Sequence, residues 1–170
     1  TRHSTLFPYT TLFRSLDRLL DHAHPAIRYR AARALAIRHH GALPGPRIAA
    51  LLDVEVARAT ALRALIGALA HPFLRGELQG RLRQCEKRGL AVLALTADPA
   101  LCRLAEHRLR DGAPRTRAQA IELIETAAPR ALAPAAVALL EAAAPPPDDP
   151  LRALVRSEEH TSELQSQNAI

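Results

Sequence analysis

The sequence contains neither methionine nor tryptophan, and aromatic residues make up only 3% of it. Its core must therefore be built from aliphatic side chains and from close helix contacts through alanine, which favours packed helices over a β-sheet. The shortage of aromatic rings also argues against a nucleic-acid site based on base stacking. Together these absences favour an all-α protein.

Cysteine is equally scarce, since Cys85 and Cys102 are the only two. They form no Cys-x-x-Cys pair and no Cys/His cluster, so a disulfide framework or a zinc site is not indicated, and a reduced, cytoplasmic setting is expected. Uncharged stretches such as 89–97 and 131–140 fall short of the roughly 18 residues that a membrane span requires. We therefore expect no membrane span in this chain.

Lysine is nearly absent, and arginine carries almost all of the positive charge behind the formal net charge of +6. An excess of positive charge of this kind favours non-specific association with polyanions, but it indicates neither a fold nor a specific function. The best candidate for a polyanion site is the cluster formed by Arg81, Arg83, Lys87 and Arg88. Its ordinary alternative is a solvated helix surface, with Glu77 and Glu86 offsetting the charge.

Serine and asparagine are confined to the two ends of the chain, residues 1–15 and 156–170. The runs TLFPYTTLFRS (5–15) and RSEEHTSELQS (156–166) resemble in-frame translations of the two adapters of a short-read sequencing library. The resemblance implies that both ends are adapter-derived and non-native, and that the native part is a fragment of metagenomic, bacterial origin. Such segments are left out of fold reasoning, and we expect them to be poorly packed.

Proline and glycine divide the remaining sequence, and between these breaks apolar residues recur every three or four positions, as a buried helix face requires. We expect the tail of one helix over 16–23 and a second helix over 25–40 that stops at Gly41. A loop over 42–45 precedes two long helices, over 46–71 and 73–98. Three shorter helices follow over 99–110, 114–127 and 134–144, so that a helical array covers 16–144. A proline-rich linker over 145–150 and the start of a truncated helix over 151–155 complete the native part.

One unit occurs twice along the chain. Counted from Pro25 and from Pro114, an arginine, a small residue and two apolar residues fall at the same offsets, and an aspartate precedes each proline. The matching signature residues are Asp21, Pro25 and Arg28 in the first unit, and Asp111, Pro114 and Arg117 in the second. This pattern resembles the HEAT-repeat family of armadillo-like α-solenoids, in which the turn aspartate and the arginine commonly connect neighbouring repeats. The resemblance implies a structural role for these residues, but the region 46–96 lacks the signature.

The region as a whole also resembles, more loosely, the HEAT-like part of bacterial proteins that carry a nucleotide-carrier-like or major-facilitator-type transporter domain. The run Arg117, Ala120, Glu122 and Ile124 carries this likeness. It implies a cytoplasmic module that is membrane-associated through a domain missing from this chain. The expected fold is all-α, with antiparallel helical hairpins stacked as a short HEAT-like α-solenoid, because a single amphipathic hairpin cannot bury its apolar stripe alone.

Three patterns invite a chemical interpretation. The histidine pairs 22/24 and 39/40 lack the i, i+4 spacing of helical metal ligands, and helix-end roles are expected for them. Cys102, Glu106 and His107 suggest a nucleophile and a base, but His107 points away from the other two, so a buried thiol is expected. Gly76 and Gly80, four positions apart, predict close helix packing and not a phosphate-binding loop.

No catalytic constellation, metal site or cofactor site is therefore expected. The leading prediction is a non-enzymatic protein-binding or scaffolding module, whose partner is another protein or a neighbouring domain of the parent chain. The alternative is a basic HEAT-like module that binds nucleic acid or phosphate. Salt-dependent binding to duplex DNA distinguishes the two.

Overall fold

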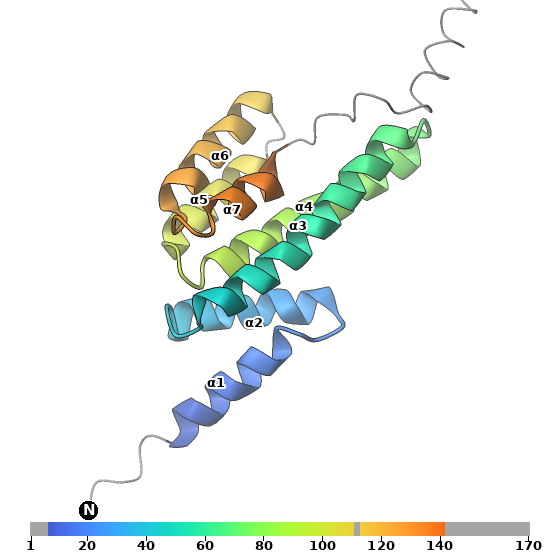
Figure 1. Cartoon of the computed structure of the whole chain (residues 1–170). Helices are drawn as coiled ribbons and strands as arrows, with labels where there is room; N and C mark the ends of the chain where they lie inside the picture. Colours follow the sequence, from blue (N-terminus) through green and yellow to red (C-terminus); the bar gives the residue numbers. More distant parts are fainter. Residues whose placement is uncertain (1–6, 111–112, 142–170) are drawn as a thin grey trace, which may run out of the picture.

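The computed structural model describes residues 7–110 and 113–141, and these are helical throughout except for short connections (Figure 1). The helices are α1 (Phe7–Leu19), α2 (Pro25–Arg38), α3 (Gly45–Ala68), α4 (Pro72–Leu93), α5 (Pro99–Arg110), α6 (Pro114–Ala127) and α7 (Ala133–Leu140). The described part contains no strand, which confirms the predicted all-α class.

Proline sets the starts of these helices. It occupies the first or second helical position in α2, α3, α4, α6 and α7, where its missing N–H removes no helical hydrogen bond. Helix α5 also begins at a proline, Pro99, and the predicted bounds of α5 and α6 match the structure. After α2, Gly41 adopts a φ of +75°, the left-handed conformation expected of a glycine that ends a helix. Its N–H donates to the carbonyl of Leu95 at 2.8 Å, which ties this turn to the segment after α4.

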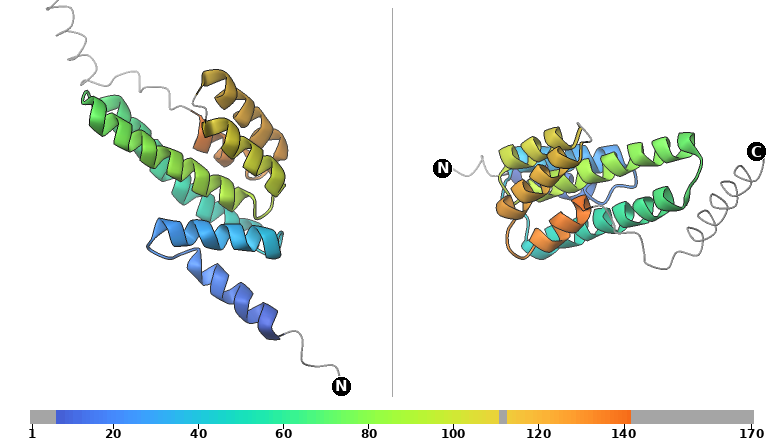
Figure 2. Two further views of the ribbon diagram at one scale, coloured as in Figure 1. Left: turned by 180° about the vertical axis from the view of Figure 1, so that it is seen from behind. Right: turned by 90° about the horizontal axis from the view of Figure 1, so that it is seen from above.

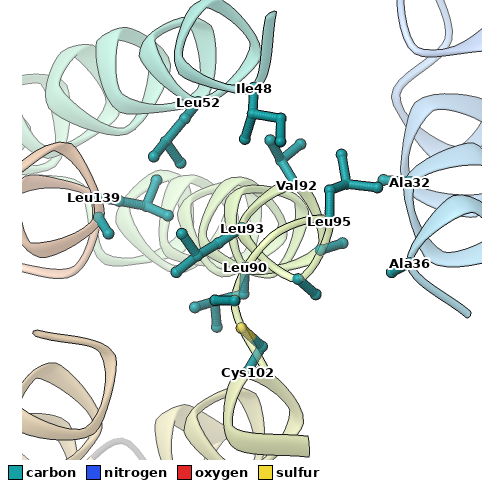
Figure 3. Packing of buried hydrophobic residues seen from close by; sticks show 14 of the residues in the cluster. Ala32, Ala36, Ile48, Leu52, Leu90, Val92, Leu93, Leu95, Cys102 and Leu139 are labelled. Atoms are coloured by element: carbon teal, nitrogen blue, oxygen red, sulfur yellow. The ribbon is translucent and has the colours of Figure 1, made fainter. Parts of the chain in front are cut away.

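The long helices α3 and α4 form an antiparallel hairpin, and α4 lies at the centre of the molecule, in contact with α2, α3, α5 and α7 (Figures 1 and 2). Its C-terminal turns and the segment that follows them are buried without interruption from Gly89 to Leu95. Figure 3 shows Leu93 of α4 among side chains from the surrounding helices, including Leu52 of α3 and Leu139 of α7. As predicted, aliphatic side chains and small residues form this core.

Helix α1 departs from the prediction, because it begins at Phe7 and thus continues through the boundary expected at Leu16. Phe13 is half-buried and packs edge-on against the ring of His39, with 5.4 Å between ring centroids. The expectation that residues 1–15 are poorly packed is therefore wrong at Phe13. The physical reason is the spacing of Phe13, Leu16 and Leu20, which places three apolar side chains toward α2 and the core.

Other boundaries shift by a few residues. Helix α4 ends at Leu93, five residues before Asp98, and turns cover the interval. Helix α7 ends at Leu140, while the remainder of the predicted 134–144 helix, the linker over 145–150, the helix start over 151–155 and the C-terminal segment 156–170 lie outside the described residues. Within the described part, no helix is both long enough and apolar enough to cross a membrane.

The pair Gly76 and Gly80 does not mediate close helix packing, so that prediction is wrong. An added Cβ atom at Gly76 would meet nothing within 4 Å, and one at Gly80 would meet only the end of Arg83. The close approach occurs at Gly89, where an added Cβ would overlap Leu139 Cδ2 and lie 3.1 Å from its Cδ1. Residues 76 and 80 belong to the part of α4 that extends past the core, whereas Gly89 faces α7.

Candidate functional sites

Two carboxylates are buried in the described part of the chain, Glu55 of α3 and Glu86 of α4, with exposed fractions of 3% and 2%. Removing a carboxylate from water costs several kcal/mol unless cations and hydrogen-bond donors replace the lost hydration. The arginines around these two side chains supply such cations and donors, and they also connect the helices to one another.

Three guanidinium groups from three helices surround Glu55. Arg58 lies 3.1 Å from Oε1, Arg88 lies 3.0 Å from Oε2, and Arg28 lies 3.6 Å from Oε1. Arg28 also donates to the carbonyls of His22 and Ala23, at 2.9 and 3.0 Å, in the turn between α1 and α2. The Glu55 cluster thus connects that turn with α3 and α4.

Glu86 lies between two guanidinium groups, those of Arg63 and Arg117. Arg63 approaches Oε1 at 3.2 Å, and Arg117 forms an ion pair with the same oxygen. Arg117 Nε also donates to the carbonyl of Leu140 at 2.9 Å, and Arg63 donates to the carbonyls of Ala138 and Leu139. Burial lowers the pKa of Arg63, while Glu86 acts in the opposite direction. The Glu86 cluster therefore joins α3, α4, α6 and the C-terminal end of α7.

The two signature arginines occupy comparable places in this arrangement. Arg28 in α2 and Arg117 in α6 each reach a buried carboxylate of the α3–α4 hairpin. Pro25 and Pro114 are the first residues of α2 and α6, as the repeat predicts.

The turn aspartate of the first unit has a different partner. Asp21 pairs with Arg47 of α3 at 2.5 Å, and so extends the contacts of that turn to the next hairpin. Its counterpart, Asp111, lies outside the described residues.

The basic cluster predicted as a polyanion site is divided among several environments. Arg88 is drawn into the Glu55 cluster and also donates to Cys85 Sγ at 3.0 Å. Lys87 lies 3.5 Å from Glu106 and 4.9 Å from the centroid of the Tyr29 ring.

The other two members stay nearer to solvent. Arg81 pairs with Glu77 at 3.4 Å on the surface, whereas Arg83 is exposed. Arg83 and Lys87 line one pocket of about 210 Å³ together with Glu106 and Arg110. The structure thus brings two of the four side chains to one pocket and does not make a single basic patch of all four.

The patterns with a chemical interpretation are occupied by structural contacts. Burial raises the pKa of the Cys102 thiol to about 12, which opposes a nucleophilic thiolate, and Glu106 pairs with Lys87 and Arg110. His24 caps α2 by accepting from the N–H of Ala26. Within residues 7–110 and 113–141, no group of three histidine, cysteine, aspartate or glutamate side chains is placed to hold a metal ion.

Sequence reasoning did not identify Glu55 and Glu86 as buried. A signal was present for Glu55, because the buried positions of α3 are Ile48, Leu52, Glu55 and Ala59, which follow steps of three and four. Its neighbour Val56, which by residue type is the expected member of an apolar stripe, is only half-buried. A glutamate at a stripe position, with an arginine three or four residues away, is the pattern to search for.

A second feature is the far part of the α3–α4 hairpin, residues 60–84, which we call the hairpin end. None of these residues is buried, although Ala59 and Cys85 on either side are. Figures 1 and 2 show that the far part of this segment extends past α2 and past α5–α7. At its base, Arg63 still donates to the carbonyls of Ala138 and Leu139 in α7. Three large apolar side chains are exposed on it: Leu65 (52%), Phe73 (76%) and Leu74 (46%).

Comparison of the chain with protein-family models, with curated proteins and with solved structures finds no match in any of the three. The features of this chain that bear on function are therefore the two buried clusters, the pockets and the hairpin end.

Proposed function

We propose that this chain is a non-catalytic, HEAT-type scaffolding module that binds a protein partner through the hairpin end. The observation that carries the proposal is the exposure of Leu65, Phe73 and Leu74 on a pair of helices that extends past the core. Exposed apolar side chains that gather on one part of a soluble protein mark interaction surfaces, and aromatic residues contribute strongly to the binding energy of such surfaces.

The rest of the molecule suits a rigid support for this surface. The Glu55 and Glu86 clusters anchor the α3–α4 hairpin to α2 on one side and to α6 and α7 on the other. A hairpin fixed at its base presents its far end in a defined orientation, so little conformational entropy is lost when a partner binds.

The HEAT-type assignment is supported by the two signature arginines, which contact the neighbouring hairpin as the family resemblance implies. The partner is then either a separate protein or a neighbouring domain of the parent chain. The looser resemblance favours one form of this proposal, in which the module is attached to a transporter domain on the cytoplasmic side of a membrane.

Site-specific photo-crosslinking tests the proposal. A photoreactive phenylalanine analogue replaces Phe73 in one variant and Leu104 of α5 in a control, because Leu104 is also an exposed apolar residue (41%) but lies away from the hairpin end. After irradiation in bacterial cells, we expect a discrete protein adduct from position 73 that Leu65→Asp removes. The adducted protein is then purified and its affinity measured. Equal labelling from both positions, or no adduct from position 73, contradicts the proposal.

Nucleic-acid binding is the alternative. It is weakened by the ion pairs of Arg88 with Glu55 and of Lys87 with Glu106, because these offset the charge of two of the four cations. Titration of the chain with duplex DNA across a salt series decides between the two. Affinity that falls steeply with salt, together with loss of binding in Arg83→Gln, would favour a nucleic-acid module in place of a protein scaffold.

A further inference from the structure

A pocket of about 210 Å³ opens beside the Glu55 cluster, at the junction of the turn after α1 with α2, α3 and α4. One part of its lining is apolar, with Leu20, Leu51, Val54 and Val92. The other part is made of charged side chains: Arg28, Arg58 and Arg88, with Glu55 and Asp21. We call this site the arginine pocket.

The positive charge of the arginine pocket is not fully balanced. Three guanidinium groups meet two carboxylates, and one of these, Asp21, pairs with Arg47 outside the pocket at 2.5 Å. The lining therefore carries at least one positive charge in excess. Burial lowers the pKa of Arg28, and the neighbouring charge of Arg58 lowers it further, as expected where cations are crowded.

Donor groups remain available in the pocket. A guanidinium group has five N–H donors, and within residues 7–110 and 113–141 the side chain of Arg58 makes one hydrogen bond, to Glu55 Oε1. Arg58 is also the most exposed of the three arginines, with 44% of its side chain open to solvent, against 16% for Arg28 and 14% for Arg88. An incoming anion can therefore reach it without disturbing Glu55, which is itself buried.

We propose that the arginine pocket binds a carboxylate that is attached to a small apolar group. The carboxylate would pair with Arg58, and the apolar group would lie against Leu51 and Val54. The apolar part of the lining suits the hydrocarbon part of such a ligand better than it suits an inorganic phosphate, which has no apolar group. The volume is below the roughly 300–1,000 Å³ of pockets for drug-sized ligands, and so suits one short aliphatic chain or side chain.

Titration of the full chain with hexanoate, followed by the arginine side-chain resonances in ¹⁵N NMR spectra, tests this inference. We expect saturable shifts of the Arg58 resonance and binding at least ~10-fold tighter than that of hexanamide, which has the same shape without the charge. Equal binding of the acid and the amide, or shifts that rise linearly without saturation, would overturn the proposal.

Matched variants locate the site. Arg58→Gln removes the exposed guanidinium and is expected to weaken hexanoate binding about tenfold, whereas Arg81→Gln, which removes an exposed arginine of α4, is expected to leave it unchanged. Val54→Glu is a second variant that places a negative charge at the pocket without removing an arginine, and it is expected to abolish binding. Circular dichroism checks that each variant is folded. Unchanged affinity in both pocket variants would refute the site.

Titration with two further ligands, both peptides, identifies the source of the carboxylate. A tripeptide that ends in leucine with a free C-terminal carboxylate is compared with its C-terminal amide. Binding of the free-acid peptide at least as tight as that of hexanoate assigns the pocket to a protein C-terminus, whereas binding of hexanoate alone assigns it to a small organic acid. The site is separate from the hairpin end, so failure here leaves the crosslinking result intact, and the reverse also holds.

Discussion

Replacing Arg117 by alanine is the most informative perturbation of the helical array. The variant removes the hydrogen bond from Nε to the carbonyl of Leu140 and one of the two cations that contact Glu86. Because α6 and α7 meet the hairpin at this point, the change tests whether the Glu86 cluster joins those helices to α3 and α4.

The expected loss follows from the local geometry. A hydrogen bond to a carbonyl contributes about 1 kcal/mol, and breaking a buried ion pair by removing one partner costs about 3–5 kcal/mol. Arg63 remains 3.2 Å from Glu86, and the Arg117 side chain is 29% exposed, so water can replace part of the lost contact. We therefore expect the free energy of unfolding to fall by about 2–3 kcal/mol, and Tm by about 5–10 °C.

Urea unfolding followed by far-ultraviolet circular dichroism measures this loss, since the chain has no tryptophan for fluorescence. Helicity in the absence of urea and the dependence of the unfolding free energy on urea concentration are expected to stay unchanged. Arg115→Ala is the control, because Arg115 is an exposed arginine in the same helix. If Arg117→Ala and Arg115→Ala both lie within about 0.5 kcal/mol of the parent chain, the assigned role of Arg117 is wrong.

Three further predictions concern packing, the thiols and the N-terminal segment. Gly89→Ala is expected to destabilise the fold by about 1–3 kcal/mol, because the added Cβ atom would overlap Leu139. Gly76→Ala lies in open space and is expected to stabilise the fold by up to about 1 kcal/mol. Equal effects of the two variants in urea unfolding would contradict this prediction. Because burial raises its pKa, Cys102 is expected to react with Ellman's reagent at pH 8 only after unfolding, and rapid reaction of the native protein would refute this prediction. The free energy of unfolding is expected to fall between about pH 9 and pH 12, because the thiol of the unfolded chain loses its proton at a lower pH than the buried thiol. Deletion of residues 1–15 is expected to preserve cooperative unfolding and to lower the free energy of unfolding by about 1–2 kcal/mol, since Phe13 packs against the core. Loss of the unfolding transition would show instead that this segment is essential to the fold.

The helices of this protein could be predicted because their starts are encoded locally. Proline at the first turn and glycine after the last require no knowledge of the tertiary structure, so α2, α5 and α6 were placed to within a few residues. The repeat of proline and arginine also led to Arg28 and Arg117, whose contacts join different helices.

The partners of those arginines could not be predicted in the same way. Whether Glu86 is a solvated surface charge or a buried one depends on the approach of α3, α6 and α7 to α4, and no local pattern fixes that approach. The same reason explains the error at Gly76 and Gly80, since the spacing of glycines on a helix does not reveal whether another helix covers them.

The dissociation constant of the crosslinked and purified partner measures the proposed protein contact at the hairpin end. Leu74→Asp is compared with Leu104→Asp, which changes the same residue type at similar exposure, 46% against 41%. We expect Leu74→Asp to weaken binding by at least ~30-fold and Leu104→Asp to leave it unchanged. Equal dissociation constants for the two variants would contradict this expectation.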